Sequence, residues 1–273
     1  MKADLHMHTT HSDGRLSREA LFKRAKEKGL DVIAITDHDV TAEVDDNVRL
    51  SQKYGIKYIP GIELSTLYKG KSVHVLGYFK GEAYKTSTMQ DYYASIKKGR
   101  EDRAKQFIAN LKHYFDIHIT YDQLLTISSG IIARPHIARA IMENYPEYTH
   151  NEIFEKFIGN DSLAYVPSTE LSLKQGLALL KEHNCIAVLA HPVLLKPHIH
   201  DEVLAHAFDG VEAVYCLNTP SDTAYYKSLA NKRNLLITAG GDYHGIKGDK
   251  KHCDLGDITL EGAALETFLS QFE

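Results

Sequence analysis

Short apolar runs alternate with stretches of helical periodicity along most of the chain. The run VIAIT at residues 32–36 is almost wholly apolar and β-branched, which is typical of a strand buried on both faces. The pattern predicts further strands at 3–8, 57–64, 72–79, 185–190, 211–215 and 235–240. It predicts helices at 17–28, 43–54, 171–183, 201–208, 221–233 and from about 262. Ser17 is a suitable N-cap for the first helix, and Gly29 a suitable stop.

This alternation predicts an α/β protein with a parallel sheet, and about seven such units would close a barrel. The rhythm is interrupted at residues 84–160, which are polar, tyrosine-rich and mostly helical in pattern. We therefore expect a barrel domain built from residues 1–80 and 165–273, carrying a helical insertion over residues 81–164.

The totals exclude several classes of protein. A net charge of −4 over 273 residues is unlike a general nucleic-acid coating protein. The three cysteines form no CxxC pair, which predicts a reduced chain without disulfides or a thiolate zinc site. The N-terminus lacks the apolar stretch of a signal peptide, and no run approaches the roughly 20 apolar residues of a spanning helix. The chain is thus expected in the cytoplasm, with no membrane association and no obligate protein partner.

Histidines and acidic residues gather where the predicted strands end. Nine of them are candidate metal ligands: His6, His8, Asp13, His38, Glu63, His74, His191, Asp242 and His244. Residues two apart on a strand face the same side, so the first two histidines are expected to share an ion. Most of the others directly follow an apolar run, at what would be the active-site rim of a barrel. Any one of them alone is better explained as a buried, hydrogen-bonded polar residue, but nine together favour a metal site.

Imidazoles and carboxylates without thiolates suit manganese, iron or zinc, with manganese preferred here. Nine groups are too many for one ion, so we expect two to three divalent ions with Glu63 as a bridge. Three ions with three carboxylates leave the site positive, which favours an anionic substrate. Such ions supply hydroxide at neutral pH, and attack by a bridging hydroxide on a phosphate ester is the expected reaction.

The segments HMH, HSDG, TDHD, PGIE, AHP and GGDYHG resemble the motifs of the PHP (polymerase and histidinol phosphatase) family. The resemblance implies a distorted (βα)7 TIM-like barrel with a trinuclear site. It implies three ligand sets: His6, His8, Glu63 and Asp242; Asp13, His38 and His244; and Glu63, His74 and His191. Gly241 departs from the pattern, since many relatives have serine before the aspartate.

The insertion with its Arg-Pro-His segment is similar to the branch of the family that acts on AMP and nucleoside 3′,5′-bisphosphates. Some members of that branch trim RNA from a 5′ phosphate. The resemblance implies that Arg134 and His136 contact the substrate phosphate, although Pro135 also suits a helix start. Glu63 and His191 are expected to be catalytic with them. Lys196 and His198 follow AHP near the rim, where they either bind substrate or are only solvated.

The leading hypothesis is thus a metal-dependent phosphoesterase acting on a nucleotide monoester or on the 5′ end of a short RNA. Histidinol phosphate phosphatase is the nearest alternative. Amidohydrolase-like C–N hydrolysis is another, although that class usually has a carboxylated lysine where Glu63 stands here. A non-catalytic, metal-dependent binding or regulatory protein is the alternative from a different class.

Overall fold

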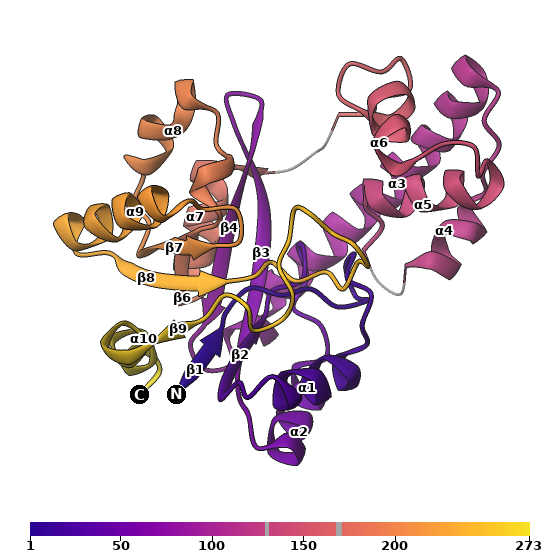
Figure 1. The fold of residues 1–273 in the computed structure, drawn as a ribbon. Coiled ribbons are helices and arrows are strands. Elements are labelled where there is room, and N and C mark those ends of the chain that lie inside the picture. Colours follow the sequence, from indigo (N-terminus) through magenta and orange to yellow (C-terminus); the bar gives the residue numbers. More distant parts are fainter. Residues whose placement is uncertain (129–130, 168–170) are drawn as a thin grey trace.

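The apolar runs form one sheet that curves into a nearly closed barrel (Figure 1). The computed structural model describes residues 1–128, 131–167 and 171–273. The strand order is β8 (Leu236–Gly240), β7 (Gly210–Tyr215), β6 (Cys185–Leu189), β4 (Lys71–Phe79), β3 (Lys57–Tyr68), β2 (Val32–Ile35), β1 (Lys2–Asp4) and β9 (Leu260–Glu261). The short β5 (Leu171–Ser172) pairs with β3. The predicted α/β class and barrel architecture are confirmed.

The segment that follows β1 connects the two flanks of the sheet. We expected a strand over residues 3–8, but the regular strand ends at Asp4. The next residues continue beside β8 through single hydrogen bonds, from Leu5 N to Ala239 O (3.0 Å) and from His8 N to Tyr243 O (2.9 Å). The N-terminal segment therefore lies between β2 and β8, and both flanks of the sheet meet there.

Two strands depart from the predicted parallel sheet: the short β9, which pairs antiparallel with β1, and β4. β4 runs antiparallel to both of its neighbours, β3 and β6, so the parallel prediction is wrong there. The reason is the turn at Lys69 and Gly70, whose φ angles of 48° and 72° suit a two-residue hairpin. A parallel return would need a crossover of a dozen or more residues, which this turn does not provide.

Helices cover the outside of the barrel at the predicted places, with shifted ends. They are α1 (Arg18–Glu27), α2 (Val44–Tyr54), α7 (Leu173–Glu182), α8 (Pro197–Leu204), α9 (Pro220–Arg233) and α10 (Gly262–Leu269). Ser17 caps α1 by accepting a hydrogen bond from Ala20 N, as predicted. The helix predicted at 201–208 begins earlier, at Pro197, because proline suits the first turn of a helix. α10 packs Phe268 against the buried Tyr78 of β4, with ring centroids 5.1 Å apart.

The insertion forms its own group of helices beside the barrel (Figure 1). They are α3 (Ser87–Phe115), α4 (Tyr121–Ile127), α5 (Arg134–Asn144) and α6 (His150–Ile153). Most of their buried apolar side chains form a separate cluster that includes Phe107, Leu124 and Ile141, while Met89 and Tyr93 near the start of α3 pack with the barrel. Residues 129–130, inside the predicted insertion, lie outside the described part of the chain. Among the described residues, no helix combines the length and apolar character needed to cross a bilayer.

The expectation of three reduced cysteines is wrong for two of them. Cys216, which follows β7, forms a disulfide with Cys253 in the loop before β9, while Cys185 is free and buried. The two half-cystines are 37 residues apart in sequence. Only the barrel brings their loops together, so spacing alone did not reveal the pair.

Candidate metal centre

His6 and His8 project into the barrel mouth from the segment after β1. Both side chains are fully buried, and their ring centroids lie 5.4 Å apart. Each Nε2 atom lies between the same two carboxylates, at 3.3 and 3.1 Å from Glu63 Oε2 and 3.2 and 3.1 Å from Asp242 Oδ1. The predicted common direction of the two histidines is therefore found.

Glu63 lies at the centre of the cluster and faces different histidines with its two oxygens. Oε2 faces His6 and His8 and also lies 3.1 Å from His38 Nδ1. Oε1 lies 2.8 Å from His74 Nδ1 and 3.0 Å from His191 Nε2. A carboxylate whose two oxygens face different groups of histidines has the geometry of a bridging ligand.

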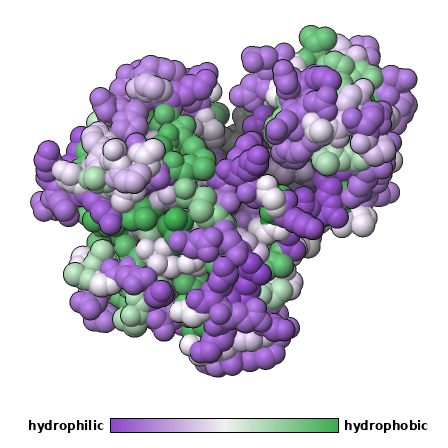
Figure 2. Space-filling model, in the orientation of Figure 1, coloured by the Kyte–Doolittle hydropathy of each residue, from purple (hydrophilic) through white to green (hydrophobic). Residues whose placement is uncertain are grey.

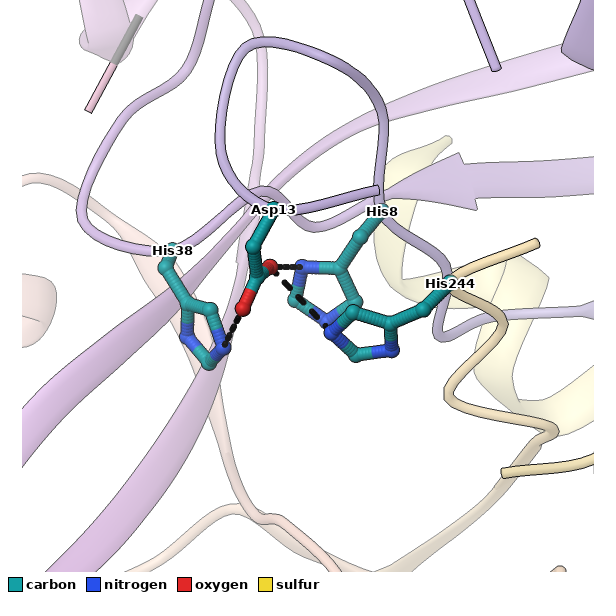
Figure 3. A group of neighbouring side chains, drawn as sticks. All are labelled: His8, Asp13, His38 and His244. Carbon is teal, nitrogen blue, oxygen red and sulfur yellow. Dashed lines mark ion pairs between the residues drawn. The ribbon is translucent and has the colours of Figure 1, made fainter. Parts of the chain in front are cut away.

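Asp13 lies among His8, His38 and His244 at the edge of the site (Figure 3). Its carboxylate lies 3.2 Å from His244 Nε2, 3.8 Å from His8 Nδ1 and 3.8 Å from His38 Nε2. Candidate ligand atoms converge in the groups His8, Asp13, His38 and His244; His6, His8, Glu63 and Asp242; and His38, Glu63 and His74. The structure thus brings together all nine residues that were predicted from the sequence, with His191 joining them through Glu63.

The donor atoms fit metal ions better than they fit one another. Buried atoms of six ligands form no hydrogen bond, although oppositely charged atoms lie within about 3 Å of several of them: His6 Nε2, His8 Nε2, Asp13 Oδ1, His38 Nδ1, Glu63 Oε2 and Asp242 Oδ1. Buried polar atoms are rarely left without partners unless an ion or water completes them. These atoms converge on shared points and do not pair, which is the arrangement of a ligand set.

The outer nitrogens of two histidines are held as they are in known metal sites. His6 Nδ1 lies 2.9 Å from the buried Glu212 carboxylate, and His244 Nδ1 lies 2.8 Å from the Asp242 carbonyl oxygen. Such bonds fix the tautomer in which Nδ1 donates and Nε2 offers its lone pair inward. Asp37 has a related supporting role, because its carboxylate accepts bonds from Thr9 and Ser12 and so holds the loop that carries Asp13.

The pKa values of the histidines in the cluster are shifted in opposite directions. Burial lowers the pKa of His8, but Asp242 and Glu63 outweigh it and raise that pKa to about 10. Burial dominates at His38 and lowers its pKa to about 4. Burial would raise the pKa of Glu63, but the neighbouring His38 and His74 keep it well below its usual range. The pKa values of Asp13 and Asp242 are likewise lowered by nearby histidines, so the three carboxylates are ionised, as ligands must be.

The backbone is strained where it presents the ligands. Asp39, His191 and Asp242 have φ angles of 55°, 28° and 52° without being glycine. Such conformations cost roughly 1–3 kcal/mol each and cluster at functional sites, where surrounding structure enforces them. Gly240 beside them lacks a side chain for a clear reason, since a Cβ there would overlap the Cβ of His6.

Several residues of the site were missed by the sequence analysis. Glu212 was detectable, because it is the only charged residue in the apolar strand VEAVY. His252 gave no signal, since it lies in an irregular loop; its ring stacks on His244 at 4.2 Å, and its Nδ1 lies 2.7 Å from Asp249. Arg100 of α3 pairs with the buried Asp39 and bonds Ser65.

A cleft of about 510 Å³ opens beside the metal ligands and is walled on its other side by the insertion. Figure 2 shows the hollow between the barrel and the helical insertion. Asp13, His38 and His74 line the barrel side, and Arg103 and Arg134 line the insertion side. Arg134 was predicted to contact substrate, and it does lie in this cleft.

The other predicted substrate contacts do not line this cleft. His136 is buried at the start of α5, where its Nδ1 accepts a hydrogen bond from Ala133 N (2.9 Å), and Pro135 occupies the first turn. Burial lowers the pKa of His136 to about 4. Lys196 and His198 are exposed at the start of α8 and are not part of the cleft wall. Their contact with substrate stays a prediction.

Comparison with known proteins agrees with this geometry. The family profile of the PHP domain matches residues 4–232. The chain is 29% identical to the 5′-3′ exoribonuclease Rnm of Salmonella typhimurium over 253 residues, covering 88% of this chain and 84% of that protein. It is 26% identical to the 3′,5′-nucleoside bisphosphate phosphatase of Chromobacterium violaceum over 250 residues, covering 88% and 86%.

Among solved structures, a protein of Bifidobacterium adolescentis described as a metal-dependent phosphoesterase matches with a TM-score of 0.86. It is 28% identical, and the match covers 99% of this chain and 96% of that one. The whole fold, insertion included, is therefore shared with that protein.

Proposed function

This chain belongs to the PHP family and is a metal-dependent phosphoesterase, and from that premise we propose that it hydrolyses a phosphate monoester of a nucleotide. The proposed substrates are AMP, a nucleoside 3′,5′-bisphosphate, or the 5′-phosphorylated end of a short RNA. The observation that carries the proposal is the convergence of unpartnered, buried ligand atoms beside a cleft walled by arginines. The activities named for the exoribonuclease and bisphosphate phosphatase relatives support the same class of substrate.

We propose two to three divalent ions, manganese foremost with iron or zinc as alternatives. Their ligand sets would be His6, His8, Glu63 and Asp242; Asp13, His38 and His244; and Glu63, His74 and His191. When bound, such ions lower the pKa of water towards neutrality and neutralise phosphoryl oxygens. Glu63 would belong to two of these sets, and Glu212 keeps His6 in the tautomer that offers Nε2 inward.

Arg134 and His136 are proposed to hold the phosphate from the insertion side. A guanidinium matches two phosphoryl oxygens at once, and its position in the cleft suits this role. His136 is neutral with Nδ1 as an acceptor, so its proton must lie on Nε2. This uncharged N–H group can donate a hydrogen bond to an anion. Lys196 and His198 are proposed only as outer contacts for a longer substrate.

The decisive experiment measures phosphate release by manganese-loaded protein from four substrates. They are AMP, adenosine 3′,5′-bisphosphate, a 5′-phosphorylated oligoribonucleotide and histidinol phosphate. We expect a clear preference for one of the nucleotides. Preference for histidinol phosphate would instead identify the protein as a histidinol phosphate phosphatase. Full metal occupancy with no release from any of them would favour another phosphoester, C–N hydrolysis or a non-catalytic module.

Replacing a ligand tests the metal assignment directly. We expect Glu63→Ala and His191→Ala to fold but to lower turnover below about 1% of wild type, because ions are lost or misplaced. Metal content by mass spectrometry and circular dichroism accompany the assay. His118→Ala, at an exposed histidine of the insertion bonded to Asp116, is the matched control and should stay fully active. Near wild-type turnover of either ligand variant would contradict the assignment.

A further inference from the structure

We propose that Glu212 is a positioning residue that couples two of the ion sites, because its carboxylate holds the ring of His6 and the main chain of His191 at the same time. The inference rests on the ligand sets proposed above. The first set is His6, His8, Glu63 and Asp242, the second is Asp13, His38 and His244, and the third is Glu63, His74 and His191. Loss of the Glu212 carboxylate should weaken the first and third sets together and leave the second intact.

Glu212 points into the barrel because the side chains of a strand alternate between its two faces. Its neighbours on β7, Val211 and Ala213, pack in the apolar cluster that also includes Ile199 of α8 and Tyr226 of α9. Glu212 therefore faces the other side, towards the ligands, and its side chain is fully buried. A buried carboxylate is costly unless its oxygens have partners, so the partners of Glu212 indicate its role.

Each oxygen of Glu212 has a different partner. Oε1 lies 2.9 Å from His6 Nδ1, and Oε2 accepts a hydrogen bond of 2.7 Å from the backbone N–H of His191. The first contact fixes the orientation of the His6 ring, whose Nε2 faces Glu63 and Asp242. The second contact ties β7 to the segment that follows β6. Because one planar carboxylate makes both contacts, a shift of either partner moves the acceptor of the other.

The contact with His191 acts on a strained part of the backbone. His191 has a φ of 28°, outside the regions that residues other than glycine adopt readily. Such a conformation persists only where the surrounding structure enforces it. The same turn brings His191 Nε2 to within 3.0 Å of Glu63 Oε1. The bond from His191 N to Glu212 therefore holds a ligand nitrogen beside the carboxylate that the first and third sets share.

The second ligand set has supports of its own. His244 Nδ1 lies 2.8 Å from the carbonyl oxygen of Asp242, and the carboxylate of Asp37 holds the loop that carries Asp13. Neither contact involves Glu212. The three sets should therefore respond differently to a substitution at Glu212, whereas a general loosening of the barrel would weaken them all.

The test replaces Glu212 with glutamine, which has nearly the same size. Glutamine has one acceptor oxygen in place of two, so it cannot accept hydrogen bonds from both the His6 ring and the His191 backbone. Manganese binding to the full-length protein is titrated by electron paramagnetic resonance, which counts free and bound ions without a substrate. We expect Glu212→Gln to keep one ion at wild-type affinity and to bind the others about 10- to 100-fold more weakly.

Asp209→Asn is the matched control. Asp209 immediately precedes β7, and its carboxylate accepts a hydrogen bond of 2.9 Å from the backbone N–H of Ala187 on β6. This acid-to-amide change at the opposite end of the same strand should leave every ion at wild-type affinity. Glu212→Asp keeps the carboxylate on a side chain one methylene shorter. It provides a second reading if glutamine impairs folding, and it should show the same selective loss.

The outcomes separate this inference from the proposed function. Equal weakening of every ion in Glu212→Gln, or no weakening of any, would overturn the coupling alone. Wild-type protein that binds at most one ion would contradict the ligand sets and the coupling together. Because the titration uses no substrate, a selective loss would support the coupling even if the substrate panel identified another reaction.

Discussion

At the scale of residues, Glu63 separates the histidines of the site into two groups, because each of its two oxygens faces a different group. The carboxylate is ionised and buried, so it attracts either protons on the histidines or cations between them. In the metal-free protein His8 is the clearest carrier of such a proton, since its pKa is raised to about 10. Protons and metal ions therefore compete for the same nitrogen.

This competition predicts a pH dependence. The His8 proton stabilises the metal-free fold fully below its usual pKa of 6.5, and that contribution is lost as the pH rises through about 10. Metal binding must displace the proton, so manganese affinity should rise about tenfold per pH unit for each proton released between pH 6.5 and 8.5. Calorimetry in buffers of different ionisation heat checks this. Heats that do not depend on the buffer, with a flat affinity, would contradict it.

The clustering of the candidate metal ligands was predictable because side chains of a strand alternate every two residues and strands end at a rim. His6 and His8 needed only that spacing, and His74 needed only Val73 and Val75 on its opposite face, both of which are buried. Glu212 stood out as a charge in an apolar strand, but its role depends on His6, which only the folded chain brings to it. Arg103 was missed for a similar reason, since only the packing of α3 shows which side of that helix faces the cleft.

At the scale of elements, β8 and the segment after β1 approach so closely that only glycine fits at residue 240. This close approach brings His6 and Asp242 together, with Nε2 and Oδ1 3.2 Å apart, as the proposed ligand set requires. We expect Gly240→Ala to destabilise the fold by about 1–3 kcal/mol, as overpacked side chains do, and to lower the bound metal. Thermal unfolding and metal analysis measure the two effects.

Gly29→Ala provides the comparison. Gly29 has a φ of 72° with nothing near its missing side chain, so alanine there is strained but meets no neighbour. It should lose stability, by roughly 1 kcal/mol, and keep its full metal content. If Gly240→Ala also keeps its metal, the close approach does not position His6.

The disulfide joins the two loops that support Asp242 from outside. Tyr215, next to Cys216, donates to Asp242 Oδ2 (3.1 Å), and His252, next to Cys253, lies 3.6 Å from the same atom. Reduction by dithiothreitol should therefore weaken manganese binding about 10- to 100-fold, as losses of such supporting contacts do. The double variant Cys216→Ser/Cys253→Ser should bind metal as the reduced protein does and no longer respond to the reagent. Identical affinities in reduced and oxidised wild-type protein would argue against this coupling.

The elements show where sequence patterns stop being informative. Alternation of strands and helices predicted the barrel, because apolar runs buried on both faces can lie between a packed barrel interior and an outer layer of helices. It could not show that β4 runs the other way, since that depends on the turn at Lys69 and Gly70. The disulfide escaped detection because it depends on loops that meet only in the folded chain.

At the scale of the whole molecule, the barrel supplies the ligands and the insertion supplies the arginines of the opposite wall. The division into residues 1–80 with 165–273 and residues 81–164 stays a prediction. Its physical basis is the separate apolar cluster of the insertion, which includes Ala104, Ile137 and Phe157. A substrate would then be held between two bodies with different apolar cores.

Because the unpartnered ligand atoms come from both ends of the chain, metal removal should weaken the entire fold. An ion that binds only the folded state, at a hundredfold excess over its Kd, stabilises that state by about 2.7 kcal/mol. For a chain of this size that corresponds to a rise in Tm of roughly 5–10 °C over chelator-treated protein, measured by differential scanning calorimetry. The rise should be much smaller in Glu63→Ala, whose bridging carboxylate is gone, and unchanged in His118→Ala. An equal rise in wild type and Glu63→Ala would mean that the stabilising ions bind elsewhere, because a site centred on Glu63 cannot survive its loss intact.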